Sequence, residues 1–405
     1  MTLPDGRAPR SALPADFIWG AATAAHQIEG GNTNSDFWAL EHAGRGQFGE
    51  PSGDACDSYH RYPDDIRLLA EAGLRAYRFS IEWTRIEPAQ GEFSRAQLLH
   101  YRAMIDACHA HGVLPIVTLH HFTSPRWFAE GGGLRRTDAV ERFTAYVDYV
   151  SEILHDIQWI VTINEPNIAA LFAGLHDAPV EGEDPISVQM ALAGGPDPTL
   201  APILAAMHHA ARDALRAKTD AKVGWAVATQ GFMPTEGHEA KWQEVFDSWE
   251  GVFFDASEGD DFIGIQSYTS QPVDANGPVP HPPHPDNTLT GWAYRPDALA
   301  INLRRVWELK GLPLLVTENG IATADDERRI AYVTGALSGL KAAVADGVEV
   351  IGYCYWSLLD NYEWGSYAPT FGLIAVDREG YFTRTPKPSL AWLGSVAAVN
   401  GSSIN

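Results

Sequence analysis

The sequence predicts an α/β fold, a (β/α)8 TIM barrel in which eight parallel strands alternate with helices. Eight short runs are apolar at consecutive positions, as in strands that are buried on both faces. Segments with the i, i+3, i+4 apolar spacing of amphipathic helices lie between these runs. No linker-like stretch interrupts the pattern, so residues 1–405 are expected to form a single domain, a length that such barrels reach.

The predicted strands are short, as strands buried in a barrel usually are. They cover residues 17–23, 76–80, 114–119, 159–164, 223–228, 262–266, 312–317 and 350–356. Helical patterns occupy residues 63–73, 94–112, 137–154 and 325–347. The second of these has typical helix ends, because Ser94 is a suitable N-cap and Gly112 a suitable stop.

Two segments show neither the apolar spacing of a helix nor the apolar run of a buried strand. They are expected to be long loops at the C-terminal face of the barrel. They are residues 179–198, after the fourth strand, and residues 271–290, after the sixth. The second segment is rich in proline and polar residues and contains His281 and His284. A solvated proline-rich loop explains these histidines better than a metal site does.

Composition and charge narrow the function classes. The net charge of −23 disfavours nucleic acid and anionic membranes as partners. The sequence shows no signal-peptide pattern and no apolar run long enough to span a membrane. Its three cysteines, at 56, 108 and 354, form no C-x-x-C pair. Together these features predict a cytoplasmic protein with reduced thiols. The sequence is compatible with a monomer and with a homo-oligomer.

Two carboxylates stand at the ends of predicted strands that are far apart in the sequence. Glu165 follows the fourth strand in "VTINEPN", and Glu318 ends the seventh in "LPLLVTENG". In a barrel of this kind, catalytic side chains come from the C-terminal strand ends, so both should face one pocket. Glycoside hydrolysis needs such a pair, one carboxyl group as proton donor and one ionised, and needs no cofactor.

Further polar residues are expected near this pair. Arg78, at the end of the second strand, could keep one carboxylate ionised, although a structural ion pair explains it equally well. Asn164 could donate a hydrogen bond. His121 belongs to a histidine doublet after the third strand and faces the same mouth. His208, by contrast, lies in a helical pattern and is interpreted as structural.

Aromatic residues follow the eighth strand in "YWSLLDNYEWGSYAPTFG". Tryptophans in such a cluster are more often core than a platform for sugar rings, but the adjacent Glu363 favours a binding role. No H-E-x-x-H motif or comparable spacing is present, so no metal site is predicted. A metal-dependent barrel hydrolase is therefore the weaker enzyme hypothesis.

The residues resemble glycoside hydrolase family 1, whose members are retaining β-glycosidases with a (β/α)8 barrel. The resemblance covers nearly the whole chain and keeps the family order. It rests on "FIWGAATAAHQIEG", "YRFSIEWTRIEP", "TLHHF", "TINEP", "DFIGIQSYTS", "VTENG", "WSLLDNYEW" and "FGLIAVD". The resemblance implies that Glu165 is the general acid/base and that Glu318 is the nucleophile.

The resemblance also implies roles for the residues around this pair. Arg78 and Tyr268 would hold the nucleophile, and Phe371 would form a wall near the primary hydroxyl of the sugar. The residues expected to bind or support the sugar ring are Gln27, His121, Asn164, Trp356, Glu363 and Trp364. An intact Glu363, with no lysine in that stretch, disfavours 6-phosphosugars.

The chain also departs from the family pattern. Gln266 stands where asparagine is usual, Glu82 where a small residue is common, and His120 where an aromatic residue is frequent. The implied function is an exo-acting β-glycosidase for β-D-glucosides, with β-galactosides or β-fucosides as further candidates. The longer Gln266 and a rather short chain motivate an alternative, an enzyme for disaccharide-bearing or bulky natural glycosides. A non-catalytic sugar-binding barrel is the remote alternative.

Overall fold

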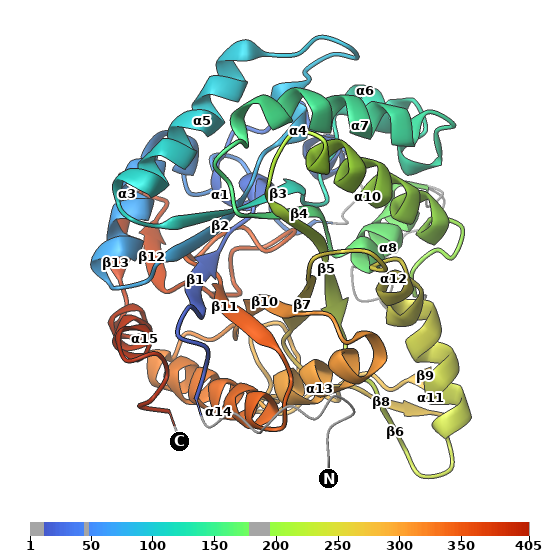
Figure 1. The fold of residues 1–405 in the computed structure, drawn as a ribbon, viewed down its shortest axis with the longest axis vertical. Helices are drawn as coiled ribbons and strands as arrows, with labels where there is room; N and C mark the ends of the chain where they lie inside the picture. Colours follow the sequence, from blue (N-terminus) through green and yellow to red (C-terminus); the bar gives the residue numbers. More distant parts are fainter. Residues whose placement is uncertain (1–11, 44–47, 178–194, 405) are drawn as a thin grey trace.

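The computed structural model describes residues 12–43, 48–177 and 195–404. Eight strands form a closed barrel in the order β1-β2-β3-β4-β5-β7-β10-β11, with β11 returning to β1 (Figure 1). Every neighbouring pair is parallel. The strands are β1 Ile18–Ala22, β2 Ala76–Ser80, β3 Leu114–His120, β4 Trp159–Asn164, β5 Lys222–Thr229, β7 Ile263–Ser267, β10 Leu314–Asn319 and β11 Val350–Trp356. All eight predicted strands are confirmed.

Helices surround the ring of strands (Figure 1). They are α1 Ala25–Ile28, α2 Asp36–Glu41, α3 Ser58–Glu71, α4 Trp83–Ile86, α5 Arg95–Ala110, α6 Arg126–Glu130, α7 Ala139–Val150, α8 Pro166–Asp177, α10 Ala201–Arg216, α11 Glu239–Phe246, α12 Val252–Asp255, α13 Ala298–Lys310, α14 Asp326–Ala345 and α15 Pro388–Ala398. Short 3-10 turns cover Gly133–Arg135 and Ser151–Ile153, and a π-helical turn covers Asp247–Gly251. Among the described residues, no helix is long and apolar enough to cross a membrane.

The predicted helix ends are confirmed in part. Ser94 caps α5 by accepting a hydrogen bond from the backbone N–H of Gln97. The helix predicted from residue 63 was placed too late, because α3 already begins at Ser58 and contains Pro63. Proline removes only one N–H donor, and near the start of a helix this loss leaves the rest of the hydrogen-bond ladder intact.

The two predicted long loops have different outcomes. Residues 179–194 of the first lie outside the described part of the chain. The second, 271–290, is less irregular than expected, since it contains β8 Pro272–Asp274 and β9 Gly277–Pro278. These strands pair antiparallel and join β6 Met233–Pro234 in a small sheet. Ala275 and Asn276 form the two-residue loop between β8 and β9, and the φ of +115° at Gly277 is one that glycine adopts readily. A further pair, β12 Ile374–Asp377 and β13 Thr383–Pro386, follows the barrel.

Mostly small and aliphatic side chains fill the barrel interior. Seven of the barrel strands each contribute to one buried cluster, through Ala22, Ala76, Ile116, Val161, Ala226, Leu315 and Cys354. A much larger apolar cluster lies between the strands and the surrounding helices. Several strands also carry polar side chains into the barrel near their C-terminal ends, namely Arg78, Asn164, Gln266 and Glu318.

An irregular register in β4 turns a polar side chain inward. Val161 pairs with Gly224, whereas Asn164 pairs with Ala226, so β4 has one residue more than β5 across this interval. Val161 packs inside the barrel, and strict alternation would place Ile163 there too. Instead Ile163 packs with the outer cluster. The extra residue therefore directs Asn164 into the barrel, as β-bulges commonly do beside active sites.

A second irregularity has the same effect in β10. Val316 pairs with Ile265, and Glu318 pairs with the next residue, Gln266. Leu315 packs inside the barrel and Val316 outside, so simple alternation would direct Glu318 outward. The additional residue reverses that parity and turns the Glu318 carboxylate toward the barrel mouth. Both sequence-predicted carboxylates are thus presented by strands with an irregular register.

Candidate active site

A cavity of about 320 Å³ lies at the C-terminal mouth of the barrel. Ten of the residues expected to form the site line it, namely Gln27, His121, Glu165, Gln266, Tyr268, Glu318, Trp356, Glu363, Trp364 and Phe371. Arg78 and Asn164 are fully buried and contact the lining residues directly. The structure therefore brings all twelve predicted side chains together, although they come from segments throughout the chain.

Glu318 is held by three donors, one on β2 and two at the end of β7. Arg78 on β2 forms an ion pair with Oε1 at 2.5 Å, and the Nε2 of Gln266 on β7 donates to the same oxygen at 2.9 Å. The hydroxyl of Tyr268 donates to Oε2 at 2.5 Å. Both carboxylate oxygens are thus satisfied, and a buried cation balances the charge. This environment favours an ionised Glu318.

Asn164 connects the same donors to β4. Its Oδ1 accepts hydrogen bonds from Arg78 at 2.5 Å and from Gln266 at 2.7 Å. Gln266, which stands where the sequence pattern usually has the shorter asparagine, therefore bridges Asn164 and Glu318 with a single amide group. The Oε1 of Gln266 and the Nδ2 of Asn164 are both buried, and neither has a hydrogen-bond partner among the described residues. These atoms can accept and donate further hydrogen bonds, respectively.

Glu165 has a contrasting environment. It follows β4 directly with a φ of +43°, before α8 begins at Pro166. No described residue donates a hydrogen bond to its carboxyl group, which lines the cavity and is half-buried. Burial raises the pKa of Glu165 well above its usual value, and the negative charge of Glu318 raises it further.

The two carboxyl groups therefore differ in the way that acid–base chemistry requires. Burial also raises the pKa of Glu318, but the charge of Arg78 and the hydrogen bonds from Tyr268 and Gln266 oppose this shift. When the pair holds one proton, it resides on Glu165, because among the described residues hydrogen-bond donors reach the carboxylate of Glu318 and not that of Glu165. Separating the pKa values of two neighbouring carboxyl groups assigns one as acid and the other as base or nucleophile.

Gln27, Trp356 and Glu363 form a polar group on another part of the cavity. The Nε1 of Trp356 donates to Oε1 of Glu363 at 3.2 Å, and Nε2 of Gln27 lies 3.3 Å from its Oε2. Burial raises the pKa of Glu363 to about 8 despite these hydrogen bonds. The Oε1 of Gln27 is buried and has no hydrogen-bond partner among the residues described. This group can accept hydrogen bonds from hydroxyls of a ligand.

Aromatic rings flank this group. The His121 ring lies 6.0 Å from Trp356 and 6.3 Å from Trp364, nearly parallel to both. Burial lowers the pKa of His121 well below its usual value, with a smaller contribution from the charge of Arg78. The ring is consequently neutral near pH 7. Flat apolar faces beside uncharged polar groups suit a sugar, which has C–H faces and hydroxyl edges.

Several cavity residues were missed by sequence reasoning. They include Phe122, Ile168, Phe172, Gln230, Thr290 and Trp292. Trp292 lies near Tyr268, with ring centroids 5.6 Å apart, but it comes from the segment between β9 and α13, where no periodic pattern or motif marks it. Phe122 follows the histidine doublet and has a φ of +67°, a conformation that its residue type does not signal.

His208 and Glu82 were expected to be structural, and their contacts agree with that role. His208 is buried and lies within hydrogen-bonding distance of Asp260 and Thr162. Glu82 accepts a hydrogen bond from Thr123, as expected for a structural role. The histidine doublet was expected to face the mouth, but only His121 lines the cavity, whereas His120 is buried and contacts Ser124.

All three cysteines are free and buried. Within residues 12–43, 48–177 and 195–404, no three histidine, cysteine or acidic side chains cluster in a way that could hold a metal ion.

A parallel (β/α)8 barrel whose cavity holds a cation-paired carboxylate and a second carboxyl group of raised pKa has the arrangement that glycoside hydrolysis requires. Sequence comparison specifies the family. The model of glycosyl hydrolase family 1 matches residues 9–260 and 255–402. This chain therefore belongs to glycosyl hydrolase family 1.

Relatives of known name agree with this assignment. The chain is 31% identical to thermostable β-glucosidase B of Thermobispora bispora, over 96% of this chain and 91% of the relative. It is also 31% identical to the bifunctional β-D-glucosidase/β-D-fucosidase of Bifidobacterium breve, over 94% of this chain and 97% of the relative. The crystal structure of β-glycosidase BGL167 superposes with a TM-score of 0.86 at 40% identity, covering 95% of this chain and 97% of that one.

Proposed function

We propose that this protein is a retaining exo-β-glycosidase that hydrolyses β-D-glucosides by double displacement. The observation that carries the proposal is the unequal carboxyl pair, in which three donors hydrogen-bond to the carboxylate of Glu318 and no described residue hydrogen-bonds to that of Glu165. The names of the two relatives support glucosides as substrates, and the Bifidobacterium breve enzyme supports fucosides as well. The alternative substrates, galactosides, differ from glucosides only at C4.

In the first step, the carboxylate of Glu318 attacks the anomeric carbon from the face opposite the leaving group. The bond from that carbon to the aglycone oxygen breaks, and Glu165 gives its proton to this oxygen. The aglycone leaves as an alcohol, and the sugar is esterified to Glu318. The carboxylate needs no separate base, because Arg78, Tyr268 and Gln266 keep it ionised.

In the second step, Glu165 acts as a base. Esterification removes the negative charge of Glu318, so the pKa of Glu165 falls and the group stays deprotonated. It then takes a proton from water, whose oxygen attacks the anomeric carbon and releases Glu318 as a carboxylate. Two inversions at this carbon give net retention, and Glu165 ends protonated for the next cycle.

The cavity supports recognition of one terminal sugar. Its volume of about 320 Å³ lies at the small end of ligand pockets, which span about 300–1,000 Å³. Gln27 and Glu363 would receive hydroxyls of the ring, Asn164 and His121 would donate to others, and Trp356 would pack against its apolar face. Trp364 and Phe371 would complete the enclosure.

Two further proposals concern the chain as a whole. A single apolar cluster includes residues from Leu13 to Ile404, which supports one catalytic domain. The three free, buried cysteines support the expected cytoplasmic location, because reduced thiols are typical of that compartment.

The direct test is turnover of p-nitrophenyl β-D-glucoside, with the α-anomer as the matched control substrate. The β-anomer should be hydrolysed and the α-anomer should not, because the leaving group of an α-glycoside lies on the face that Glu318 would occupy. Steady-state release of p-nitrophenol measures both. A folded protein that hydrolyses neither the monoglucoside nor aryl β-galactosides and β-fucosides would contradict the proposal. Turnover confined to aryl β-diglycosides would support the alternative for larger glycosides.

A further inference from the structure

Phe371 forms part of the cavity wall and belongs to a long segment after β11. Its side chain packs inside the barrel mouth, edge-on to the Tyr268 ring, with ring centroids 5.8 Å apart. Tyr268 in turn donates to Glu318. The position of Phe371 therefore affects both the shape of the sugar cavity and the packing of a residue that contacts the nucleophile. No regular strand or helix contains Phe371, so its placement depends on other contacts.

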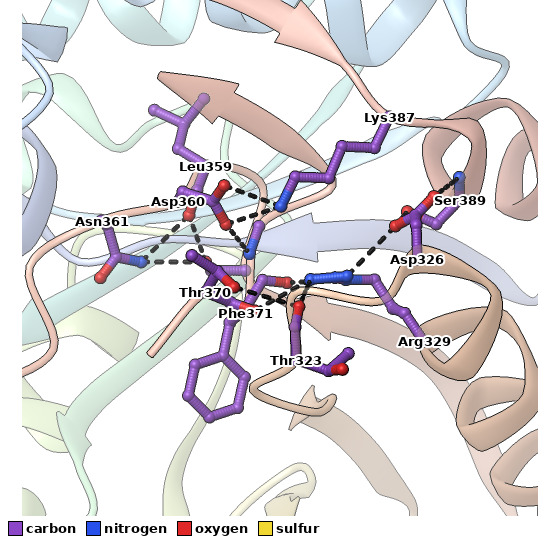
Figure 2. A network of polar contacts seen from close by, with 12 residues as sticks. Thr323, Asp326, Arg329, Leu359, Asp360, Asn361, Thr370, Phe371, Lys387 and Ser389 are labelled. Carbon is purple, nitrogen blue, oxygen red and sulfur yellow. Dashed lines mark hydrogen bonds and ion pairs between the residues drawn. The ribbon is translucent and has the colours of Figure 1, made fainter. Parts of the chain in front are cut away.

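A buried arginine of α14 supplies these contacts. The guanidinium of Arg329 donates through Nη2 to the carbonyls of Thr370, at 2.9 Å, and of Thr323, at 2.6 Å, and its Nε lies 3.5 Å from the carbonyl oxygen of Phe371 (Figure 2). Arg329 has no exposed surface. One side chain thus ties the segment after β10 to the segment after β11, directly beside the cavity wall.

Two other side chains of α14, those of Asp326 and Tyr332, contact Arg329 or the neighbouring cavity wall. The Nη1 of Arg329 lies 3.1 Å from Oδ1 of Asp326. This oxygen also accepts a hydrogen bond from the hydroxyl of Ser389, and Oδ2 of Asp326 accepts one from the backbone N–H of Ser389 (Figure 2). One turn after Arg329, the hydroxyl of Tyr332 donates to the carbonyl of Tyr268 at 2.6 Å. The same helix face therefore holds the backbone of both neighbouring wall residues, Phe371 and Tyr268.

Further hydrogen bonds hold the backbone at Phe371 and at Gly372, the next residue. The backbone N–H of Gly372 donates to Oδ1 of Asp360 at 2.8 Å, and the Asp360 carboxylate forms an ion pair with Lys387 at 2.7 Å (Figure 2). Gly372 approaches the backbone so closely that an added Cβ would lie 2.0 Å from the nitrogen of Asp360. The hydroxyl of Tyr355 also donates to the carbonyl of Phe371, at 2.8 Å.

We propose that Arg329 is a positioning residue for substrate choice. By holding the backbone at residues 370 and 371, it sets the position of the Phe371 ring and so determines which sugar substituents the cavity accepts. Arg329 is not among the residues that line the cavity. This inference rests on the proposed function, because it concerns the same cavity, but it assigns a determinant of specificity to the outer helix layer.

The test is a double-mutant cycle with Arg329→Gln, Phe371→Leu and the combined variant. The readout is the ratio of kcat/KM for p-nitrophenyl β-D-glucoside to that for the β-D-xyloside and for the β-D-galactoside. These substrates differ from the glucoside in the exocyclic CH2OH group and in the configuration at C4, respectively. Each single variant should change at least one ratio by about tenfold, the effect of a misfitted group in an apolar pocket.

Coupling distinguishes positioning from general destabilisation. If Arg329 acts through Phe371, the combined variant should change the ratio no more than the larger single change, because residues in contact are not additive. Arg329→Lys, which keeps the charge but has one nitrogen for several carbonyls, should give an intermediate ratio. Arg384→Gln is the matched control. It removes a buried arginine that is paired with Asp65 away from the cavity, so it should lower stability and leave both ratios unchanged.

Crystal structures of the wild type and Arg329→Gln provide a readout that needs no turnover. The Phe371 ring should be displaced or should adopt more than one position in the variant. Unchanged ratios in Arg329→Gln, or additive effects in the combined variant, would overturn the inference while leaving the glycosidase proposal intact. If the wild type has no activity on any aryl β-glycoside, the proposed function fails, and an undisturbed Phe371 in the variant structure would then overturn the positioning role as well.

Discussion

Replacing Glu318 with alanine should lower kcat for p-nitrophenyl β-D-glucoside by at least about 10⁴-fold, on the scale known for loss of a catalytic nucleophile. The variant lacks the atom that forms the covalent intermediate, and its remaining partners, Arg78 and Tyr268, cannot replace it. Steady-state kinetics with the wild type and the variant measure the loss. Circular dichroism and thermal unfolding establish that the variant is folded.

A small anion should partly restore the activity of Glu318→Ala. Azide can enter the space left by the carboxylate, beside the positive charge of Arg78, and attack the anomeric carbon once. A single displacement would give the α-glycosyl azide. The matched control is Asp65→Ala, which removes a buried carboxylate from an ion pair with Arg384 outside the cavity and should retain kcat. A Glu318→Ala variant with near wild-type kcat and no added anion would exclude Glu318 as nucleophile.

Replacing Glu165 with glutamine should produce a loss that depends on the leaving group. The amide cannot donate a proton, so glycosides of weakly acidic alcohols should be hydrolysed about 10²- to 10⁴-fold more slowly. A 2,4-dinitrophenyl glycoside needs no protonation, so its first step should be nearly unaffected. Its second step should become limiting, because no base remains to activate water. A burst of dinitrophenol followed by slow turnover would display this change.

The pH profile provides a second readout of the same residue. Glu165 must be protonated for the first step, so wild-type activity should fall as the pH rises through its elevated pKa. Glu165→Gln should lose the part of this dependence that Glu165 causes. An equal loss for all leaving groups, with an unchanged pH profile, would contradict the acid/base assignment. Added azide should accelerate the second step for the dinitrophenyl substrate, since azide needs no general base.

The barrel was predictable because its strands have a strong and simple signal. Runs such as residues 114–119 and 350–356 are apolar on both faces, which few elements other than buried parallel strands require. The positions of Glu165 and Glu318 at strand ends then indicated one pocket, since all C-terminal strand ends meet at the same mouth. The family resemblance added the surrounding residues, and the cavity contains them.

The parts that were not predicted depend on contacts between distant segments. The register irregularities that turn Asn164 and Glu318 inward arise from pairing with β5 and β7, and no local pattern signals them. The same holds for Trp292, which reaches the cavity from a segment without periodicity. The early start of α3 and the short hairpin around Gly277 were obscured by prolines, which usually mark breaks in regular structure.

The central claim is that Glu318 forms a covalent intermediate, and the anomeric configuration of the first product tests it most directly. Proton NMR during hydrolysis of p-nitrophenyl β-D-glucoside by the wild type would record the anomeric signals before mutarotation mixes them. Double displacement predicts that β-glucose appears first and that the α-anomer follows only as the solution equilibrates. Initial release of α-glucose would mean a single displacement by water and would contradict the mechanism.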